Sequence, residues 1–247
     1  VLAFVRNGKI LDSQITANQG NGIKITSSEN IIVVGNNISN NAYYGILLSS
    51  NTNDTILSSN NVSFNNKDGI YLSSSYNNSI IQNEIFNNSY RGILMKYSDN
   101  NTISHNHIYY NGAGGTVNWE MDGMYLDHSC NNTISANYIH NNTRNGLALV
   151  HDTEYNTIFK NNLTCNGEVG WGGNGLILHD ACFNWISQNN LSKNGGYGIN
   201  IFSEGQHNTI YNNSFLNNMR GLRIGDDATN LNDYNVIRNN LFKDNWE

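Results

Sequence analysis

Apolar residues recur along this chain in short alternating groups, each of which begins with a glycine. The pattern Gly-Φ-x-Φ, in which Φ is an apolar residue, appears nine times, and successive glycines lie 23 to 31 residues apart. An apolar residue at every second position predicts a strand with one face in a core, and repetition at a fixed period predicts a solenoid. The nine glycines are Gly22, Gly45, Gly69, Gly92, Gly123, Gly146, Gly175, Gly198 and Gly221.

A second pattern, Asn-x-Ile-x-x-Asn-x-Φ-x-x-Asn, fills the rest of each period, as at Asn78, Asn83 and Asn88. Each period therefore holds three short apolar groups that are separated by polar corners. These groups are too short for a helical periodicity and suit strands of three to five residues. The sequence predicts an all-β parallel β-helix of about ten coils, each of about 23 residues with three short strands.

The composition agrees with this prediction. The 247 residues include 51 Asn and no Pro. Coils that stack about 4.8 Å apart place like side chains above one another, so Ile can fill the interior while corner Asn side chains form amide ladders. Asn also tolerates the left-handed backbone that a sharp corner needs, and Pro would remove a hydrogen-bond donor from the stack.

Several classes of protein are excluded by composition. No proline-rich linker divides the chain, so we expect one domain over residues 1–247, taken from a longer or processed chain. No run of 18 apolar residues predicts a membrane span. The net charge of -6, with scattered basic residues, argues against a nucleic-acid partner. The cysteines Cys130, Cys165 and Cys182 form no CxxC pair, and we expect free thiols.

The repeated blocks NNTISxNxIxxN and GIxLxxSxxN resemble the PbH1 repeats of right-handed parallel β-helix proteins of the NosD and carbohydrate-binding/sugar-hydrolase (CASH) type. That superfamily includes polysaccharide lyases and mannuronan C5-epimerases. The resemblance covers nearly the whole chain and implies a right-handed, single-stranded β-helix. It also implies an extracellular, cell-surface or periplasmic location. The segment 122–128 has residue types similar to those of the epimerase site but lacks its Asp-Pro-His signature.

Two periods carry insertions, at about 112–122 and 167–174. Both enter at the corner before a Gly-Φ strand, two coils apart, so we expect them to flank one groove. Each brings a Trp and an acid, a combination suited to stacking against sugar rings and to hydrogen bonding with them. The alternative is that the Trp rings only cover their own loops. The predicted substrate-binding residues are Trp119, Glu120, Asp122, Trp171, Asp180 and Arg223.

The strand beside these insertions carries the predicted chemistry. Side chains two and four residues after each glycine point out of the coil, and between Lys96 and Asp180 this outward surface becomes ionisable and aromatic. Neighbouring coils should place Lys96 near Asp127 and His128 near His151, about 5 Å apart, with His179 two coils from Asp127, at about 10 Å. The candidate catalytic residues are Lys96, Tyr125, Asp127, His128, His151 and His179.

Three functions fit these residues. The first is an enzyme that acts on an acidic polysaccharide by removing the proton next to a uronate carboxylate, with His151 or His128 as the base, Tyr125 as the acid and Lys96 or Arg223 against the carboxylate. Paired carboxylates would instead suit a glycoside hydrolase. The second is a non-catalytic surface or sheath protein, whose exterior would be glycosylated at its eleven Asn-x-Ser/Thr sequons.

The third function is metal handling of the NosD type, which the resemblance suggests and for which these histidines and acids are candidate ligands. Calcium is a further candidate cofactor, held by Glu120 and Asp122, and Asp152 is another possible metal ligand. The remaining histidines are expected to be solvated. Because open β-helix ends expose unpaired strands, end-to-end or edge-mediated self-assembly is a further expectation.

Overall fold

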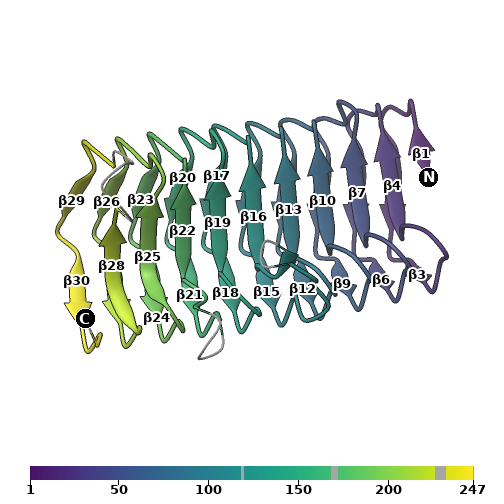
Figure 1. Ribbon diagram of the computed structural model, residues 1–247. Coiled ribbons are helices and arrows are strands. Elements are labelled where there is room, and N and C mark those ends of the chain that lie inside the picture. The colour runs from purple at the N-terminus through teal and green to yellow at the C-terminus, as the bar shows by residue number, and fades with distance from the viewer. Residues whose placement is uncertain (118–119, 168–171, 226–231, 247) are drawn as a thin grey trace.

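The computed structural model describes residues 1–117, 120–167, 172–225 and 232–246, and the strands among them form three parallel sheets of ten strands each. Successive coils lie side by side along one axis, with the N-terminus at one end and the C-terminus at the other (Figure 1). Every third strand belongs to the same sheet, so each coil contributes one strand to each sheet. The predicted three-stranded coil, repeated ten times, is confirmed.

The first sheet contains the Gly-Φ-x-Φ strands. Its strands are β1 (Leu2–Ala3), β4 (Ile23–Thr26), β7 (Ile46–Ser49), β10 (Ile70–Ser73), β13 (Ile93–Lys96), β16 (Met124–Asp127), β19 (Leu147–Val150), β22 (Leu176–His179), β25 (Tyr197–Phe202) and β28 (Arg220–Ile224).

The other two sheets are built from the shorter apolar groups. The second contains β2 (Lys9–Leu11), β5 (Ile32–Val34), β8 (Ile56–Ser58), β11 (Ser79–Ile81), β14 (Thr102–Ser104), β17 (Thr133–Ser135), β20 (Thr157–Phe159), β23 (Trp185–Ser187), β26 (Thr209–Tyr211) and β29 (Val236–Arg238). The third contains β3 (Gln14–Thr16), β6 (Asn37–Ser39), β9 (Asn61–Ser63), β12 (Glu84–Phe86), β15 (His107–Tyr109), β18 (Tyr138–His140), β21 (Asn162–Thr164), β24 (Asn190–Ser192), β27 (Ser214–Leu216) and β30 (Leu241–Lys243).

The core follows from the period of two within each strand. On β10, Ile70 and Leu72 are fully buried, while Tyr71 and Ser73 point outward and are only partly covered. The register pairs Ile70 with Ile93 of the next coil, so equal positions stack in columns. Burial of these columns supplies the main stabilising free energy, at about 25 cal/mol per Å² of apolar surface.

Buried asparagines form the predicted ladders, at three corners of each coil from Asn78 onward and at fewer corners in the first three coils. Asn60 donates from its backbone N and its Nδ2 to Oδ1 of Asn83, both at 3.0 Å, and its Nδ2 also donates to the carbonyl of Val33 at 2.9 Å. Asn83 donates in the same way to Asn106. The Asn60 amide thus joins three consecutive coils, and it satisfies backbone groups that would otherwise be buried without partners.

The left-handed corner residue is not the ladder residue but the one directly before it. Ala136 has φ 53° and precedes ladder Asn137, and Tyr155 has φ 56° and precedes ladder Asn156. The left-handed position accepts Phe, Tyr, His and Lys as well as Asn, whereas the ladder position needs an amide that both donates and accepts. We expected one residue to fill both roles, and the structure divides them between two neighbours.

The cysteines are free thiols, as expected. In the described part of the chain, no helix is long and apolar enough to cross a membrane. At the last coil, Phe242 and Leu241 are about half exposed. Self-assembly through such a surface stays a prediction.

Replacing a ladder asparagine should destabilise the protein far more than replacing its neighbour. Asn137→Leu removes donors to Ile103 and Asn161 and leaves the N and Nδ2 of Asn106 without their acceptor. Buried unsatisfied groups cost about 1 to 3 kcal/mol each, so the midpoint of urea unfolding should fall sharply. The control Ala136→Gly relaxes a left-handed residue and should change the unfolding free energy by less than about 1 kcal/mol. Equal effects of the two variants would contradict the ladder's role.

Candidate active-site cleft

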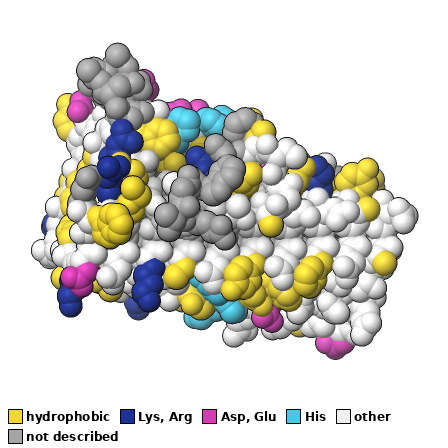
Figure 2. Space-filling view, turned by 60° about the horizontal axis from the view of Figure 1, so that its bottom comes forward, with side chains coloured by type: hydrophobic (Ala, Val, Ile, Leu, Met, Phe, Trp, Pro, Cys, Tyr) yellow, Lys and Arg dark blue, Asp and Glu magenta, His cyan; other side chains and the backbone are white. Residues whose placement is uncertain are grey.

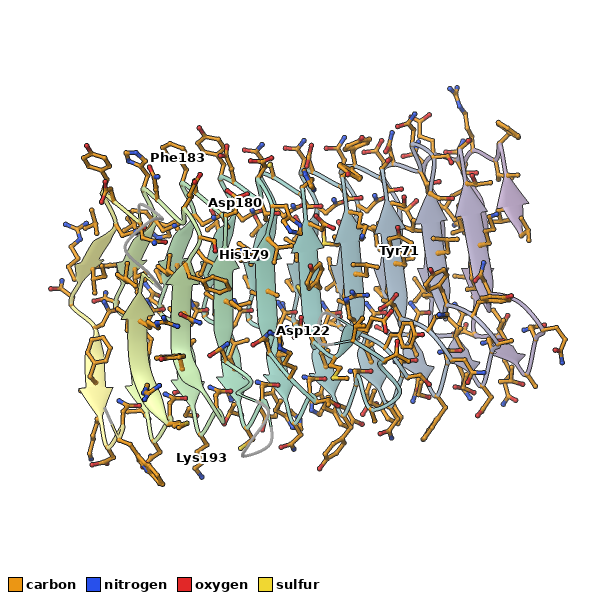
Figure 3. All side chains as sticks on the ribbon, viewed as in Figure 1. Tyr71, Asp122, His179, Asp180, Phe183 and Lys193 are labelled. Atoms are coloured by element: carbon orange, nitrogen blue, oxygen red, sulfur yellow. The ribbon has the colours of Figure 1, made fainter. Side chains whose placement is uncertain are left out.

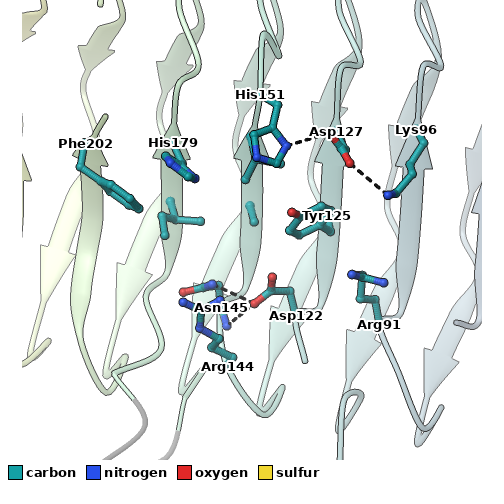
Figure 4. A pocket seen from close by; sticks show the side chains of 13 residues that line it. Arg91, Lys96, Asp122, Tyr125, Asp127, Arg144, Asn145, His151, His179 and Phe202 are labelled. Carbon is teal, nitrogen blue, oxygen red and sulfur yellow. Dashed lines mark hydrogen bonds and ion pairs between the residues drawn. The ribbon is translucent and has the colours of Figure 1, made fainter. Parts of the chain in front are cut away.

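A cleft of about 560 Å³ lies on the outer face of the first sheet, over β13, β16, β19, β22 and β25. Its side chains form two rows with Tyr125 between them (Figure 4). The upper row contains Lys96, Asp127, His151, His179 and Phe202, and the lower row contains Arg91, Asp122, Arg144 and Asn145. The cleft thus has one row at each end of the strands, as the labelled Asp122 and His179 also show (Figure 3).

Asp127 is the centre of the upper row. Its Oδ2 lies 3.1 Å from Nζ of Lys96 on β13, and its Oδ1 lies 3.0 Å from Nδ1 of His151 and 2.7 Å from Nδ1 of His128. The strand register pairs Asp127 with Lys96 on one neighbouring coil and with Val150 on the other. Because His151 directly follows Val150, its ring can reach Asp127. The predicted proximity of Lys96 to Asp127 is therefore confirmed.

The charge state of Asp127 follows from these contacts. Partial burial pushes its pKa upward, but the hydrogen bonds from His151, His128 and Lys96 outweigh burial and lower the pKa below its ordinary value. Asp127 is therefore ionised at neutral pH and can only accept hydrogen bonds. Each bonded Nδ1 must donate its proton, so a neutral His151 carries its free lone pair on Nε2.

Apolar side chains form the floor between the rows. Leu94, Tyr125, Ala148 and Ile177 occupy one outward column, in register on successive strands, and each is less than a tenth exposed. Val150 joins them, and Phe202 packs against the group. Although these residues point out of the coil, each covers its neighbours. The small side chain of Ala148 separates the larger Tyr125 and Ile177. An apolar floor between polar rows suits a ligand with an apolar face and polar edges, such as a sugar ring.

The lower row is more buried than the sequence predicted. We expected Asp122 to lie on a projecting loop, but it is fully buried, and its Oδ1 accepts hydrogen bonds from N and Nδ2 of Asn145 at 2.9 and 2.8 Å. Its Oδ2 has no hydrogen-bond partner among the residues that the structure describes. Burial raises the pKa of Asp122 to about 6, although Arg144 and Arg91 oppose that rise. Asp122 still reaches the cleft, because it immediately precedes Gly123 and β16.

Two arginines of the cleft were not among the predicted site residues. Arg91 bonds Asp68 through Nη1 at 3.3 Å, and its guanidinium lies 4.7 Å from the centre of the Tyr125 ring. Arg144 forms no ion pair with any residue that the structure describes. The sequence placed Arg91 on or next to this face but took the site residues from the positions after each glycine and from the two insertions, whereas Arg91 lies directly before Gly92 and Arg144 lies two positions before Gly146. Reading the positions before the glycines would have found both.

The other predicted residues fall into three groups. His179 lies in the cleft two coils from Asp127, with Val150 between them, as predicted. His128 contacts Asp127 from beside the cleft, and its ring lies 5.7 Å from that of His151. Asp180 and Arg223 are not in the cleft lining, where Arg223 was expected to face a carboxylate. Arg223 instead lies over the ring of Tyr197.

The insertion residues contribute less than predicted. Glu120 accepts hydrogen bonds from N and Oγ1 of Thr116 in its own loop, both at 3.0 Å, and is not among the cleft residues. Trp119 and Trp171 lie outside the described residues, so their predicted role in sugar stacking stays a prediction.

One group of potential metal ligands is present among the described residues. Ligand atoms of Asp127, His128 and His151 all lie within 4.8 Å of one another. The cation Lys96 already contacts the same carboxylate, which disfavours a second cation there. Glu120 and Asp122, the expected calcium ligands, do not belong to this group, and Asp152 contributes only a 3.9 Å contact to His128. The predictions of calcium and of a metal-handling role stay predictions.

Histidines gather in a second place, on the third sheet. Figure 2 shows histidine side chains in two places, one beside charged groups and one among hydrophobic side chains. His107 and His140 were expected to be solvated, but their Nε2 atoms lie 2.7 Å apart, and Tyr109 and Tyr138 stack against them. Burial and the nearby His107 lower the pKa of His140 to about 4. These histidines are less solvated than expected because the register between coils stacks their rings against one another.

The three parallel sheets and their side-chain ladders define a right-handed parallel β-solenoid with a cleft on one face. The family described as "Right handed beta helix region" matches residues 2–62, 50–215 and 166–246, and the chain belongs to this family. Among curated proteins, no sequence matches at a significant level.

Solved structures share the fold at low sequence identity. The periplasmic alginate epimerase AlgG is 22% identical with a TM-score of 0.74, covering 85% of this chain and 50% of that chain. The Azotobacter vinelandii mannuronan C-5 epimerase AlgE4 A-module is 14% identical with a TM-score of 0.81, covering 95% of this chain and 65% of that chain. The Dettilon tailspike protein is 14% identical with a TM-score of 0.76, covering 97% and 54%. The chain thus spans about half to two thirds of their lengths.

The contacts of Asp127 should make stability depend on pH. Because the folded state lowers the pKa of Asp127, its ionisation stabilises the fold above its ordinary pKa of about 3.9, and this contribution is lost as pH falls through the lowered value. Asp127→Asn should therefore lower the melting temperature at pH 7, and the difference from the unaltered protein should shrink towards pH 3.

The matched control is Asp54→Asn, because Asp54 is exposed and lies away from the cleft. This control should change the melting temperature little at either pH. A difference between Asp127→Asn and the unaltered protein that stayed the same from pH 7 to pH 3 would contradict the assignment.

Proposed function

We propose that the protein binds an acidic polysaccharide in this cleft and acts on a uronate residue by removing the proton next to its carboxylate. The observation that carries the proposal is the contact between Asp127 and His151 at the edge of an apolar floor. Loss of that proton leads either to β-elimination, which cleaves the chain, or to epimerisation, in which a proton returns to the opposite ring face.

His151 is the proposed base. Asp127 holds the Nδ1 proton of His151, so Nε2 is the atom that accepts the substrate proton, and the carboxylate stabilises the imidazolium that forms. The side chain of His151 is about half exposed, which leaves it accessible to a polymer. His128 bonds the same oxygen of Asp127 and supports its orientation.

Tyr125 is the proposed acid. Burial raises the pKa of its phenol to about 12, with a further contribution from the charge of Asp127, so the hydroxyl keeps its proton at neutral pH. In elimination, the Tyr125 hydroxyl would protonate the departing glycosidic oxygen while the electron pair left at the deprotonated carbon forms the double bond. The ring of Tyr125 lies between the two rows, beside the place where a sugar would rest on the floor (Figure 4).

Cations are needed because proton removal spreads negative charge onto the uronate carboxylate. Arg144 lines the cleft without an ion pair among the described residues, and Lys96 lies beside Asp127. Arg144 is therefore the best placed partner for the substrate carboxylate, with Lys96 as a second. Two proteins that share the fold, AlgG and the AlgE4 A-module, are described as an alginate epimerase and a mannuronan C-5 epimerase, which supports this class of substrate.

A glycoside hydrolase is the second candidate, and one observation favours it. Asp122 has a raised pKa of about 6 and Asp127 a lowered one, and such a split between two carboxyl groups is typical of an acid and a base in glycoside hydrolysis. Three hydrogen bonds already occupy Asp127, which makes it less suited to activating water than to orienting His151. A hydrolase would release no unsaturated sugar, so the products separate the candidates.

We also propose that the protein works outside the cytoplasm, where acidic polysaccharides are found as matrix and surface polymers. AlgG, which shares the fold, is described as periplasmic. A non-catalytic surface role stays the alternative if the protein binds such polymers without changing them.

His151→Gln should abolish most of the activity on the acidic polysaccharide that the protein uses. Loss of a general base lowers kcat by about 100-fold or more. Turnover is measured from the near-ultraviolet absorbance of unsaturated products, and from the uronate composition of the polymer by NMR. The control is His105→Gln, because His105 is exposed and belongs to the corner after the second sheet. Activity that survives His151→Gln at the level of this control would remove His151 from the mechanism.

A further inference from the structure

The lower row of the cleft contains two buried polar atoms without protein partners. Among the described residues, Oδ2 of Asp122 and Nε of Arg91 are both buried and unpaired, and both residues line the cleft. Buried polar atoms normally have a partner, so an unpaired acceptor and an unpaired donor in one cleft point to a ligand. The two residues lie on neighbouring coils, because N of Gly92 donates to the carbonyl of Asp122 at 3.4 Å.

The fold itself does not need a carboxylate at residue 122. The residue before each Gly-Φ strand belongs to a further side-chain ladder, in which the side chain accepts the backbone N–H of the next coil. Asn21 accepts from Tyr44, Asp122 from Asn145, and Asn145 in turn from Asn174. Asparagine does this work at residues 21 and 145 without the cost of burying an acid. The same ladder holds a second acid, Asp68, which is paired with Arg91, whereas the second carboxylate oxygen of Asp122 has no hydrogen-bond partner among the described residues.

We propose that Arg91 and Asp122 form a subsite that binds two adjacent hydroxyl groups of a sugar ring. One hydroxyl donates to Oδ2 of Asp122, and its neighbour accepts from Nε of Arg91. The inference rests on the proposed function, and it adds that the substrate presents a vicinal diol to the lower row. Two oxygens on neighbouring ring carbons can reach neighbouring coils, which lie about 4.8 Å apart.

The chemistry of the two atoms selects hydroxyls over a second carboxylate. A carboxylate has no proton to donate to Oδ2 and would be repelled by an ionised Asp122, whereas hydroxyls both donate and accept. Arg91 is held in place by Asp68 and by the face of Tyr125, so the geometry of its Nε is fixed before the ligand arrives. The apolar floor beside Tyr125 then lies next to the bound ring.

Asp122→Asn tests the subsite with little change to the fold. The amide oxygen still accepts from Asn145, but an NH₂ group replaces the unpaired acceptor Oδ2. KM for the acidic polysaccharide should rise about tenfold or more, with kcat changed much less, because the lost hydrogen bond to a charged group holds substrate and transition state alike. Arg91→Lys keeps a cation for Asp68 but removes Nε, and it should also raise KM. The control is Asn21→Asp, a similar exchange in the same ladder far from the cleft, which should leave KM unchanged.

The double variant of Arg91 and Asp122 tests whether the two residues bind the same sugar ring or affect KM independently. If both residues hold one diol, the rise in KM of the double variant should be smaller than the product of the two single rises.

Unchanged KM in Asp122→Asn, with normal turnover by the unaltered protein, would mean that the two atoms hold only water, and this inference would be wrong while the proposed function stood. A loss of kcat at constant KM would instead make Asp122 a proton-transfer group and overturn the subsite. Absence of any turnover on acidic polysaccharides by the unaltered protein would overturn the proposed function, and the subsite with it.

Discussion

The hydrogen-bonded register between coils is the constraint on which the rest of this structure depends. Parallel pairing fixes each residue against the residue one coil away, and the asparagine ladders reinforce that pairing from inside the corners. Every outward side chain therefore has a fixed neighbour along the axis. The cleft follows from this constraint, because Lys96, Asp127 and His151 meet only when three successive coils keep their register. In a solenoid, a site is thus made by substituting residues along columns, and the backbone path stays the same.

Much of the fold could be predicted from the sequence because the repeat exposes the register directly. The glycine spacing aligns the first sheet, and the Asn spacing aligns the corners. What the sequence did not reveal was that two adjacent residues share the work of each corner. Ala136 adopts the left-handed backbone conformation, and Asn137 makes the ladder hydrogen bonds. Because Asn is also frequent at left-handed positions, the composition alone does not distinguish the two roles.

The site could be predicted only in part, for two physical reasons. Residues on the strands, such as Lys96 and Asp127, were placed correctly because the period of two fixes their direction. Residues before the glycines were harder, since a corner can turn a side chain inward or outward. Asp122 was expected on a loop and is buried against Asn145. The side chain of Arg91 turns from its corner towards the ring of Tyr125. The contact between His107 and His140, which are both only partly buried, was missed because ring stacking between coils depends on neighbours that are 33 residues apart in the sequence.

Removal of the proton next to a uronate carboxylate is the chemistry that we propose for the cleft. The most direct test incubates the protein in D₂O with a panel of uronate-containing polysaccharides and follows that hydrogen by NMR and mass spectrometry. We expect that the hydrogen is lost, either replaced by deuterium in an epimerised residue or absent from an unsaturated end. Chain cleavage that retains this hydrogen in every product would contradict the claim and favour hydrolysis.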